Sequence, residues 1–192
     1  TVLDFRNDGF VAYIKEANAH SVVAAIKIVQ EFQNEKDVKV HVVLDSDSVM
    51  SGVVGTDKKM QAIAISGSYN IVAKLLNFIE KAETSILCTE KIHGLTKEYD
   101  CRYVGKIKEN ESELRIYEIY SGDIPELAAK KKSTERDFLD AVFSFYAGDF
   151  RTARGEFLSV VRKNPHDGIA KYYLYLADSF DKENEGKAVY LD

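Results

Sequence analysis

This sequence has few cysteines and prolines and no long apolar segment. Its 192 residues include two cysteines, Cys88 and Cys101, which form no C-x-x-C pair. This argues against a disulfide framework or a zinc site and indicates a reducing compartment, so we expect a cytoplasmic protein. There are only two prolines, and no apolar run approaches the ~20 residues that span a bilayer. We therefore expect a folded protein without membrane contact.

An excess of basic residues is also missing. The chain carries 26 Lys and Arg against 31 Asp and Glu, which gives a net charge of -5. Because neutralising phosphates requires a basic face, this balance argues against nucleic-acid binding. The length suits one large domain or a medium domain plus a small one. The sequence begins without Met, inside a segment patterned as a strand, so we expect a fragment of a longer protein.

Alternating and helical patterns predict the elements of the first part of the chain. The segments VLDF and GFVAYI flank the turn signal NDG and predict a hairpin. Apolar residues at helical spacing predict one helix over about 18–34 and a second after SGSYN, lined by residues 71–79. Between the helices, DVKVHVVLDSDSVMSGVVG predicts two strands with DSDS as their turn, and QAIAI predicts a third.

Strands continue to alternate irregularly with helices up to residue 122. TSILC predicts a strand, TEKIHGLTKEY a short helix or a loop, and CRYVGKIK and ELRIYEIY two strands joined by ENES. Because the elements show no regular βαβ period, they favour an α+β fold in which helices cover a mixed sheet. We assign residues 1–122 to this domain.

The character of the sequence changes after residue 122. Residues 123–133 contain Pro125 and the run KKK, and we expect a linker or a connecting helix there. Residues 134–192 resemble a tetratricopeptide (TPR) helix-turn-helix, with Gly148 between its helices, Pro165 after the second, and a further helix packed over the open end. One such unit cannot bury its own apolar face, so it should pack against the preceding domain, a partner or its dimer mate.

Four segments, in order, resemble the class III nucleotidyl cyclase domain, the family of adenylate and guanylate cyclases. DFRNDGFVAYI resembles the strand pair whose G-D-G turn presents a metal-binding aspartate, and VHVVLDSDSVMSGVVG resembles the G-I-H hairpin. ISGSYNIVAKL resembles the G-D-x-V-N-x-A-x-R-L helix start, and IKENESELRIYEIY resembles the closing strands. The resemblance covers residues 2–120 and implies a ferredoxin-like sheet that lacks its first strand and helix.

The resemblance implies a catalytic centre built from metal ions and polar side chains. Asp8 matches the second of two aspartates that hold Mg²⁺ or Mn²⁺ while the ribose 3′-hydroxyl attacks the α-phosphorus. Asn70 matches the asparagine that orients the ribose. Lys74 takes the place of the transition-state arginine, and it keeps the charge but loses the bidentate fork.

The positions that would bind the nucleotide depart further from the family. Lys108 matches the lysine that contacts the terminal phosphates, but Glu109 follows it where the family has glycine. Ile63 stands where active cyclases read the purine edge with a polar group, and Asp4 reverses the charge of the lysine that would assist. The first metal aspartate has no counterpart, through degeneration or truncation. The resemblance therefore implies an inactive domain that regulates, dimerises or binds a partner, with Mg²⁺ or Mn²⁺ needed only if activity remains.

The residues that match the family also suit ordinary structural roles. Asp8 suits a turn and Asn70 a helix cap, while Lys74 and Lys108 suit solvated positions. The chain could be a divergent active cyclase whose first aspartate lies upstream, or its helical tail could dock a peptide. Because the family's pockets form between two subunits, we expect a homodimer or pairing with another cyclase-like domain. The four histidines show no metal spacing, and helix packing explains the tyrosines of segment 172–175.

Overall fold

The computed structural model describes residues 2–5, 8–15, 18–35, 37–109, 112–183 and 190–191. Its strands are β1 (Val2–Phe5), β2 (Phe10–Tyr13), β3 (Val42–Leu44), β4 (Val49–Thr56), β5 (Lys59–Ser66), β6 (Ile86–Thr89), β7 (Cys101–Glu109) and β8 (Ser112–Ile119). Its helices are α1 (Ala19–Phe32), α2 (Ser68–Lys81), α3 (Glu90–His93), α4 (Pro125–Tyr146), α5 (Phe150–Lys163) and α6 (Gly168–Glu183). This order confirms the α+β prediction, and a short helix forms where a helix or a loop was expected.

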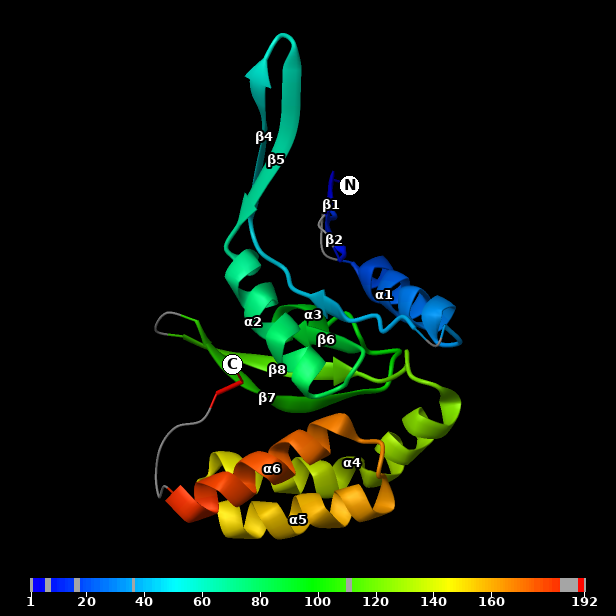
Figure 1. The fold of residues 1–192 in the computed structure, drawn as a ribbon, viewed down its shortest axis with the longest axis vertical. Helices are drawn as coiled ribbons and strands as arrows, with labels where there is room; N and C mark the ends of the chain where they lie inside the picture. The colour runs from blue at the N-terminus through cyan, green and yellow to red at the C-terminus, as the bar shows by residue number, and fades with distance from the viewer. Residues whose placement is uncertain are drawn as a thin grey trace.

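A four-stranded mixed sheet lies at the centre of the body (Figure 1). Its strand order is β3-β6-β8-β7, with β3 parallel to β6 and the other neighbours antiparallel. Ile86 and Cys88 of β6 pack with α1 and α3, while Leu87 packs with α2 and the helices α4–α6. All four residues of β6 are buried. Because successive side chains of a strand point to opposite faces, this shows that helices cover both faces of the sheet at β6.

Two hairpins stand apart from the central sheet. β1 pairs with β2, and β4 pairs with β5; among the described residues neither pair joins a third strand. The β4–β5 hairpin projects from the body as a long arm (Figure 1). The segment DSDS is therefore not a turn between paired strands as expected, because β3 enters the central sheet and β4 enters the arm. Asp45 fixes this divergence, since its carboxylate accepts hydrogen bonds at 2.6 Å from the hydroxyls of Ser68 and Thr89.

The C-terminal helices pack against the sheet face opposite α1. Gly148 follows α4 with a φ of 84°, a conformation that favours glycine, and α5 ends shortly before Pro165. Ala141, Ala153 and Phe157 are fully buried where these helices meet. We expected either a linker or a connecting helix over residues 123–133. Residues 125–133 form the first turns of α4, so the segment is a connecting helix. The TPR identity and the division into domains at residues 122 and 133 stay predictions.

A buried ion network joins these helices to the sheet. Arg102 of β7 is fully buried, with its Nε 2.6 Å from Glu118 Oε2 on β8. Its two terminal nitrogens bind both carboxylate oxygens of Asp167, before α6, at 2.7 and 2.8 Å. Lys131 of α4 binds Glu118 at 2.7 Å and Asp123 at 2.6 Å. Each buried charge thus has a partner of opposite charge. The attraction between them offsets a desolvation penalty of several kcal/mol per ion.

The network also shifts the acidity of its members. Burial by itself raises the pKa of Glu118, but Arg102 and Lys131 outweigh burial and hold that pKa at about 2, below the ordinary 4.5. Burial likewise lowers the pKa of Lys131, yet Glu118 and Asp123 raise it above its usual value. Both groups are therefore charged at neutral pH, and the ionised form of Glu118 is stabilised by folding.

We predict that Arg102→Leu lowers the free energy of unfolding at pH 7 by about 3–5 kcal/mol, because Glu118 and Asp167 lose their shared cation while buried. Urea denaturation measures the change. The control Arg154→Leu removes an ion pair to Asp178 whose side chains are 47% and 40% exposed, and it should cost less than about 1 kcal/mol.

Lowering the pH should reduce the difference in the free energy of unfolding between the wild type and Arg102→Leu. The pKa of Glu118 is depressed in the folded state, so its contribution is present above about 4.5 and is lost as the pH falls toward about 2. The variant lacks that contribution and has less to lose. Equal destabilisation by the two arginine substitutions, or a gap that does not change with pH, would contradict the network's role.

Candidate functional site

A hollow of about 430 Å³ lies between the start of α2 and the end of β7. Its walls come from Asn70, Ala73 and Lys74 on α2 and from Glu109 on β7. Asn70 and Lys74 are four residues apart, so the helix presents them on one face. Three of the residues that the cyclase resemblance singles out, Asn70, Lys74 and Lys108, therefore lie at or beside one concave surface.

The position of α2 depends on the buried carboxylate of Asp45. Its side chain is 1% exposed and receives hydrogen bonds from Ser68, the first residue of α2, and from Thr89 at the end of β6. Lys91 places its ammonium 3.8 Å away and offsets the buried charge. The structure thus gives Asp45, which the sequence pattern placed in a turn, a role in anchoring α2.

Within the hollow, Lys74 is already engaged by the chain. Its ammonium donates a hydrogen bond to the carbonyl oxygen of Lys108 at 3.0 Å and lies 3.8 Å from the carboxylate of Glu109. The side chain of Lys108 is exposed, and its residue lies opposite Glu113 on β8. A phosphate entering the hollow would meet the Lys74 cation together with the Glu109 carboxylate, which offsets most of the attraction.

The remaining predicted site residues do not line the hollow. Asp8 is exposed beside the turn of the β1–β2 hairpin. Ile63 is half-buried on the arm, opposite Gly52. Asp4 lies on β1 opposite Val11, and its side chain is outside the described part of the chain. Among the described residues, no group of three or more His, Cys, Asp or Glu is placed to hold a metal ion. The metal-binding role of Asp8 stays a prediction.

Cys101 and His93, which the sequence patterns did not connect, lie close together on the sheet face that α1 and α3 cover. Sγ of Cys101 lies 3.5 Å from Nδ1 of His93, whose ring stacks on Tyr117 with centroids 3.8 Å apart. Burial raises the pKa of the Cys101 thiol and lowers the pKa of His93. Both groups are therefore neutral at pH 7, whereas a nucleophilic cysteine needs its thiolate. We assign the pair a packing role.

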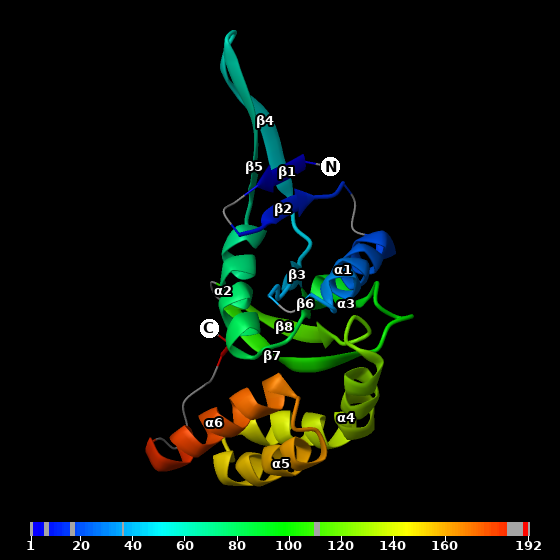
Figure 2. The same cartoon turned by 45° about the vertical axis from the view of Figure 1, so that its right-hand side comes forward.

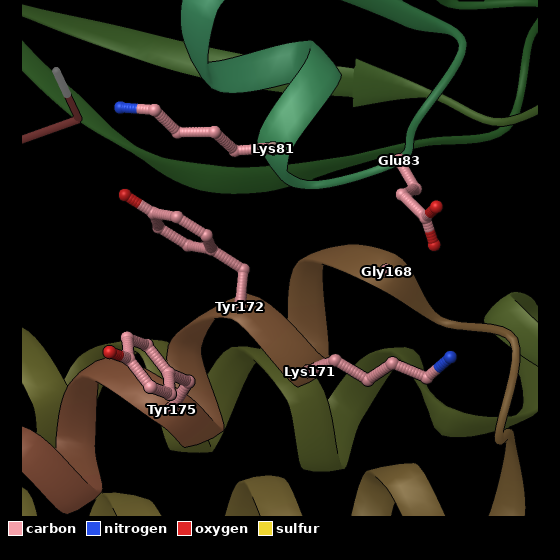
Figure 3. A pocket seen from close by; sticks show the side chains of 6 residues that line it. All are labelled: Lys81, Glu83, Gly168, Lys171, Tyr172 and Tyr175. Atoms are coloured by element: carbon pink, nitrogen blue, oxygen red, sulfur yellow. The ribbon is translucent and has the colours of Figure 1, made fainter.

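A second hollow, of about 270 Å³, separates the end of α2 from α6 (Figure 3). It is lined by Lys81, Glu83, Gly168, Lys171, Tyr172 and Tyr175. The rings of Tyr172 and Phe78 meet edge to face at 5.2 Å, and Tyr173 is fully buried and donates a hydrogen bond to the carbonyl of Val104. Packing thus explains these two tyrosines, as expected, whereas Tyr175 is 72% exposed beside the hollow.

Comparison with known proteins gives no relative. No protein-family model, no curated protein and no solved structure matches the chain. In the part of the chain that the structure describes, no helix has both the length and the apolar character needed to cross a membrane.

We predict that Glu109→Gln tightens the binding of inorganic triphosphate about threefold to tenfold, because it removes the carboxylate that neutralises Lys74 in the hollow. Isothermal titration at low ionic strength measures the change. Glu80→Gln, an exposed position near the other end of α2, makes the same change in net charge as a control. Equal gains from both variants would mean that net charge alone acts and that the hollow binds no phosphate.

Proposed function

We propose that this chain is a degenerate class III cyclase homology domain with a TPR-like helical unit, and that it acts as a regulatory, dimerising or partner-binding module of a larger signalling protein. The observation that carries the proposal is the state of Lys74. The residue in the place of the transition-state arginine is bound to the chain's own Lys108 carbonyl and Glu109 carboxylate. A group held in this way is poorly placed to stabilise a charged phosphate in a transition state.

The composition of the remaining positions supports the same proposal. Cyclisation needs two metal ions at the attacking and leaving oxygens, and a single aspartate such as Asp8 cannot hold both. Ile63 offers no hydrogen bond to a purine, and a buried purine edge without a partner costs about 1–3 kcal/mol per group. The chain thus retains the order of the family's segments and lacks several of its functional groups.

An active cyclase is the second candidate, because Asn70 and Lys74 line one hollow and the carbonyl of Lys108 lies beside it, bonded to Lys74. In that case Mg²⁺ or Mn²⁺ would bind Asp8 together with an aspartate from an upstream segment. A third candidate is peptide docking at the helical tail, for which the hollow beside Tyr175 offers a concave surface with two lysines.

Titration with nucleotide separates the first two candidates. We predict that ATP and GTP, with or without Mg²⁺ or Mn²⁺, bind no more tightly than a Kd of roughly 1 mM, which corresponds to about 4 kcal/mol. Isothermal titration calorimetry makes the measurement. Low-micromolar binding that requires a metal and disappears in Asp8→Ala would contradict the proposal and favour an active site.

A further inference from the structure

The outer edge of β7 is closed by two side chains and by a short segment beyond α6. β7 lies at one end of the strand order and pairs with β8, and such edge strands present unpaired backbone groups. Here the carbonyl of Val104 accepts a hydrogen bond from the Tyr173 hydroxyl at 2.6 Å. The N–H of Lys106 donates to the Tyr146 hydroxyl at 3.0 Å, and its carbonyl accepts from the N–H of Leu191 at 3.0 Å. Two of these partners are tyrosines of α4 and α6, whereas the third is the backbone of the segment beyond α6.

Leu191 occupies a position at this edge that suits one aliphatic side chain. It is 2% exposed and belongs to the main apolar core. Beneath it lies Gly105, whose φ of 151° favours glycine. A Cβ on that glycine would lie 2.5 Å from the hydroxyls of Tyr146 and Tyr173 and 3.1 Å from Cδ1 of Leu191. The backbone of Lys106 together with Gly105, Tyr146 and Tyr173 therefore forms a site, called the edge site below, that exists only while residue 105 has no side chain.

Tyr190 makes a second contact beside the first, at the surface. Its hydroxyl donates a hydrogen bond to Oε1 of Glu113 on β8 at 3.0 Å. The ammonium of Lys106 donates to both oxygens of the same carboxylate, at 2.8 and 2.9 Å. That ammonium also lies 5.5 Å from the ring centroids of Tyr190 and Tyr146, within the range of a cation–π contact. An aromatic residue is thus offered a cation and a carboxylate, and the residue after it is offered a buried apolar position and a backbone acceptor.

The contact between this segment and the edge site is small enough to be exchanged. Among the described residues, segment 190–191 is held by a backbone hydrogen bond, a buried leucine and an exposed bond between a phenol and a carboxylate. Figure 2 shows the segment, in red, beside the central sheet and apart from the end of α6. Ordering two residues costs conformational entropy of the same order as the gain from burying one leucine. Unlike the Arg102 network, this contact can therefore be released without leaving a buried charge unpaired.

We propose that the edge site binds an extended peptide of a partner protein in which an aromatic residue precedes leucine or another aliphatic residue, and that Tyr190–Leu191 competes with this peptide. The site contacts two adjacent side chains and one backbone N–H, and an extended segment of another protein supplies the same groups by adding to the edge of the sheet. This inference deepens the partner-binding role in the proposed function and rests on it only for its relevance. It needs no nucleotide and lies outside the Asn70 hollow.

The test empties the edge site and measures whether a peptide enters it. The probe is a fluorescein-labelled peptide amide with the sequence KAVYLD of residues 187–192, and fluorescence anisotropy measures its binding to the full chain. Leu191→Asp places a carboxylate where burial disfavours it, so the chain's own segment should leave the site and the probe should bind at least tenfold more tightly than to the wild type. Leu76→Asp makes the same change at a position on α2 that is 43% exposed, and its affinity for the probe should equal that of the wild type.

Two further comparisons make the result specific to the leucine and to the site. A second probe, KAVYDD, carries aspartate in place of leucine and should not bind any form of the chain. Leu191→Ala should give a smaller gain in affinity for the first probe, and it keeps the test decisive if Leu191→Asp does not fold. Binding of the first probe should also slow hydrogen exchange of the β7 amides.

Equal binding of the first probe by the wild type, the Leu191 variants and Leu76→Asp, or binding by none of them, overturns the proposal. Light scattering covers one more occupant. A dimer that dissociates in Leu191→Asp but not in Leu76→Asp would place the segment of a second copy in the edge site, and it would also overturn the proposal. Metal-dependent nucleotide binding would instead overturn the proposed function and leave the edge site standing.

Discussion

The architecture depends on one fully buried guanidinium. Arg102 binds Glu118 on the neighbouring strand and Asp167 before α6, and its Cζ lies 3.8 Å from the ring centroid of Phe138 on α4. Asp167 in turn accepts a hydrogen bond from the backbone N–H of Ala170 and so caps α6. A single side chain thus fixes the sheet, α4 and α6 relative to one another, at a desolvation cost that only its partners offset. The edge-to-face contact of Tyr172 on α6 with Phe78 on α2 then links this packing to the helix that carries Asn70 and Lys74.

Local patterns predict most of the elements, because period and turn chemistry are local. The helix expected over 18–34 forms at Ala19–Phe32, and Gly148 breaks the chain where expected. The partners of each strand were less predictable. The sequence DSDS has the composition of a turn, yet Asp45 binds Ser68 and Thr89, which are 23 and 44 residues away, and β3 and β4 separate. Interactions over such separations leave no trace in a local pattern.

At the candidate site, too, local patterns do not predict contacts between residues that are far apart in the sequence. Asn70 and Lys74 share a face of α2 because they are four residues apart on one helix, whereas Lys108 was singled out only by the resemblance. It could not predict that Lys74 would bond the Lys108 carbonyl, since that contact depends on how α2 meets β7. The Lys131 ammonium was likewise hidden in a run of three lysines, where only one position faces the sheet. The β4–β5 arm was visible as a strand pattern, but its isolation from the sheet was not.

We expect no cyclase chemistry at the hollow of Asn70 and Lys74, and an assay for cyclic nucleotide can decide this. The chain at high micromolar concentration would be incubated with ATP or GTP and Mn²⁺, and cyclic nucleotide measured by mass spectrometry. We predict no product above the protein-free control, for the wild type and for Asn70→Ala alike. A cyclic nucleotide formed by the wild type and lost in Asn70→Ala would contradict it.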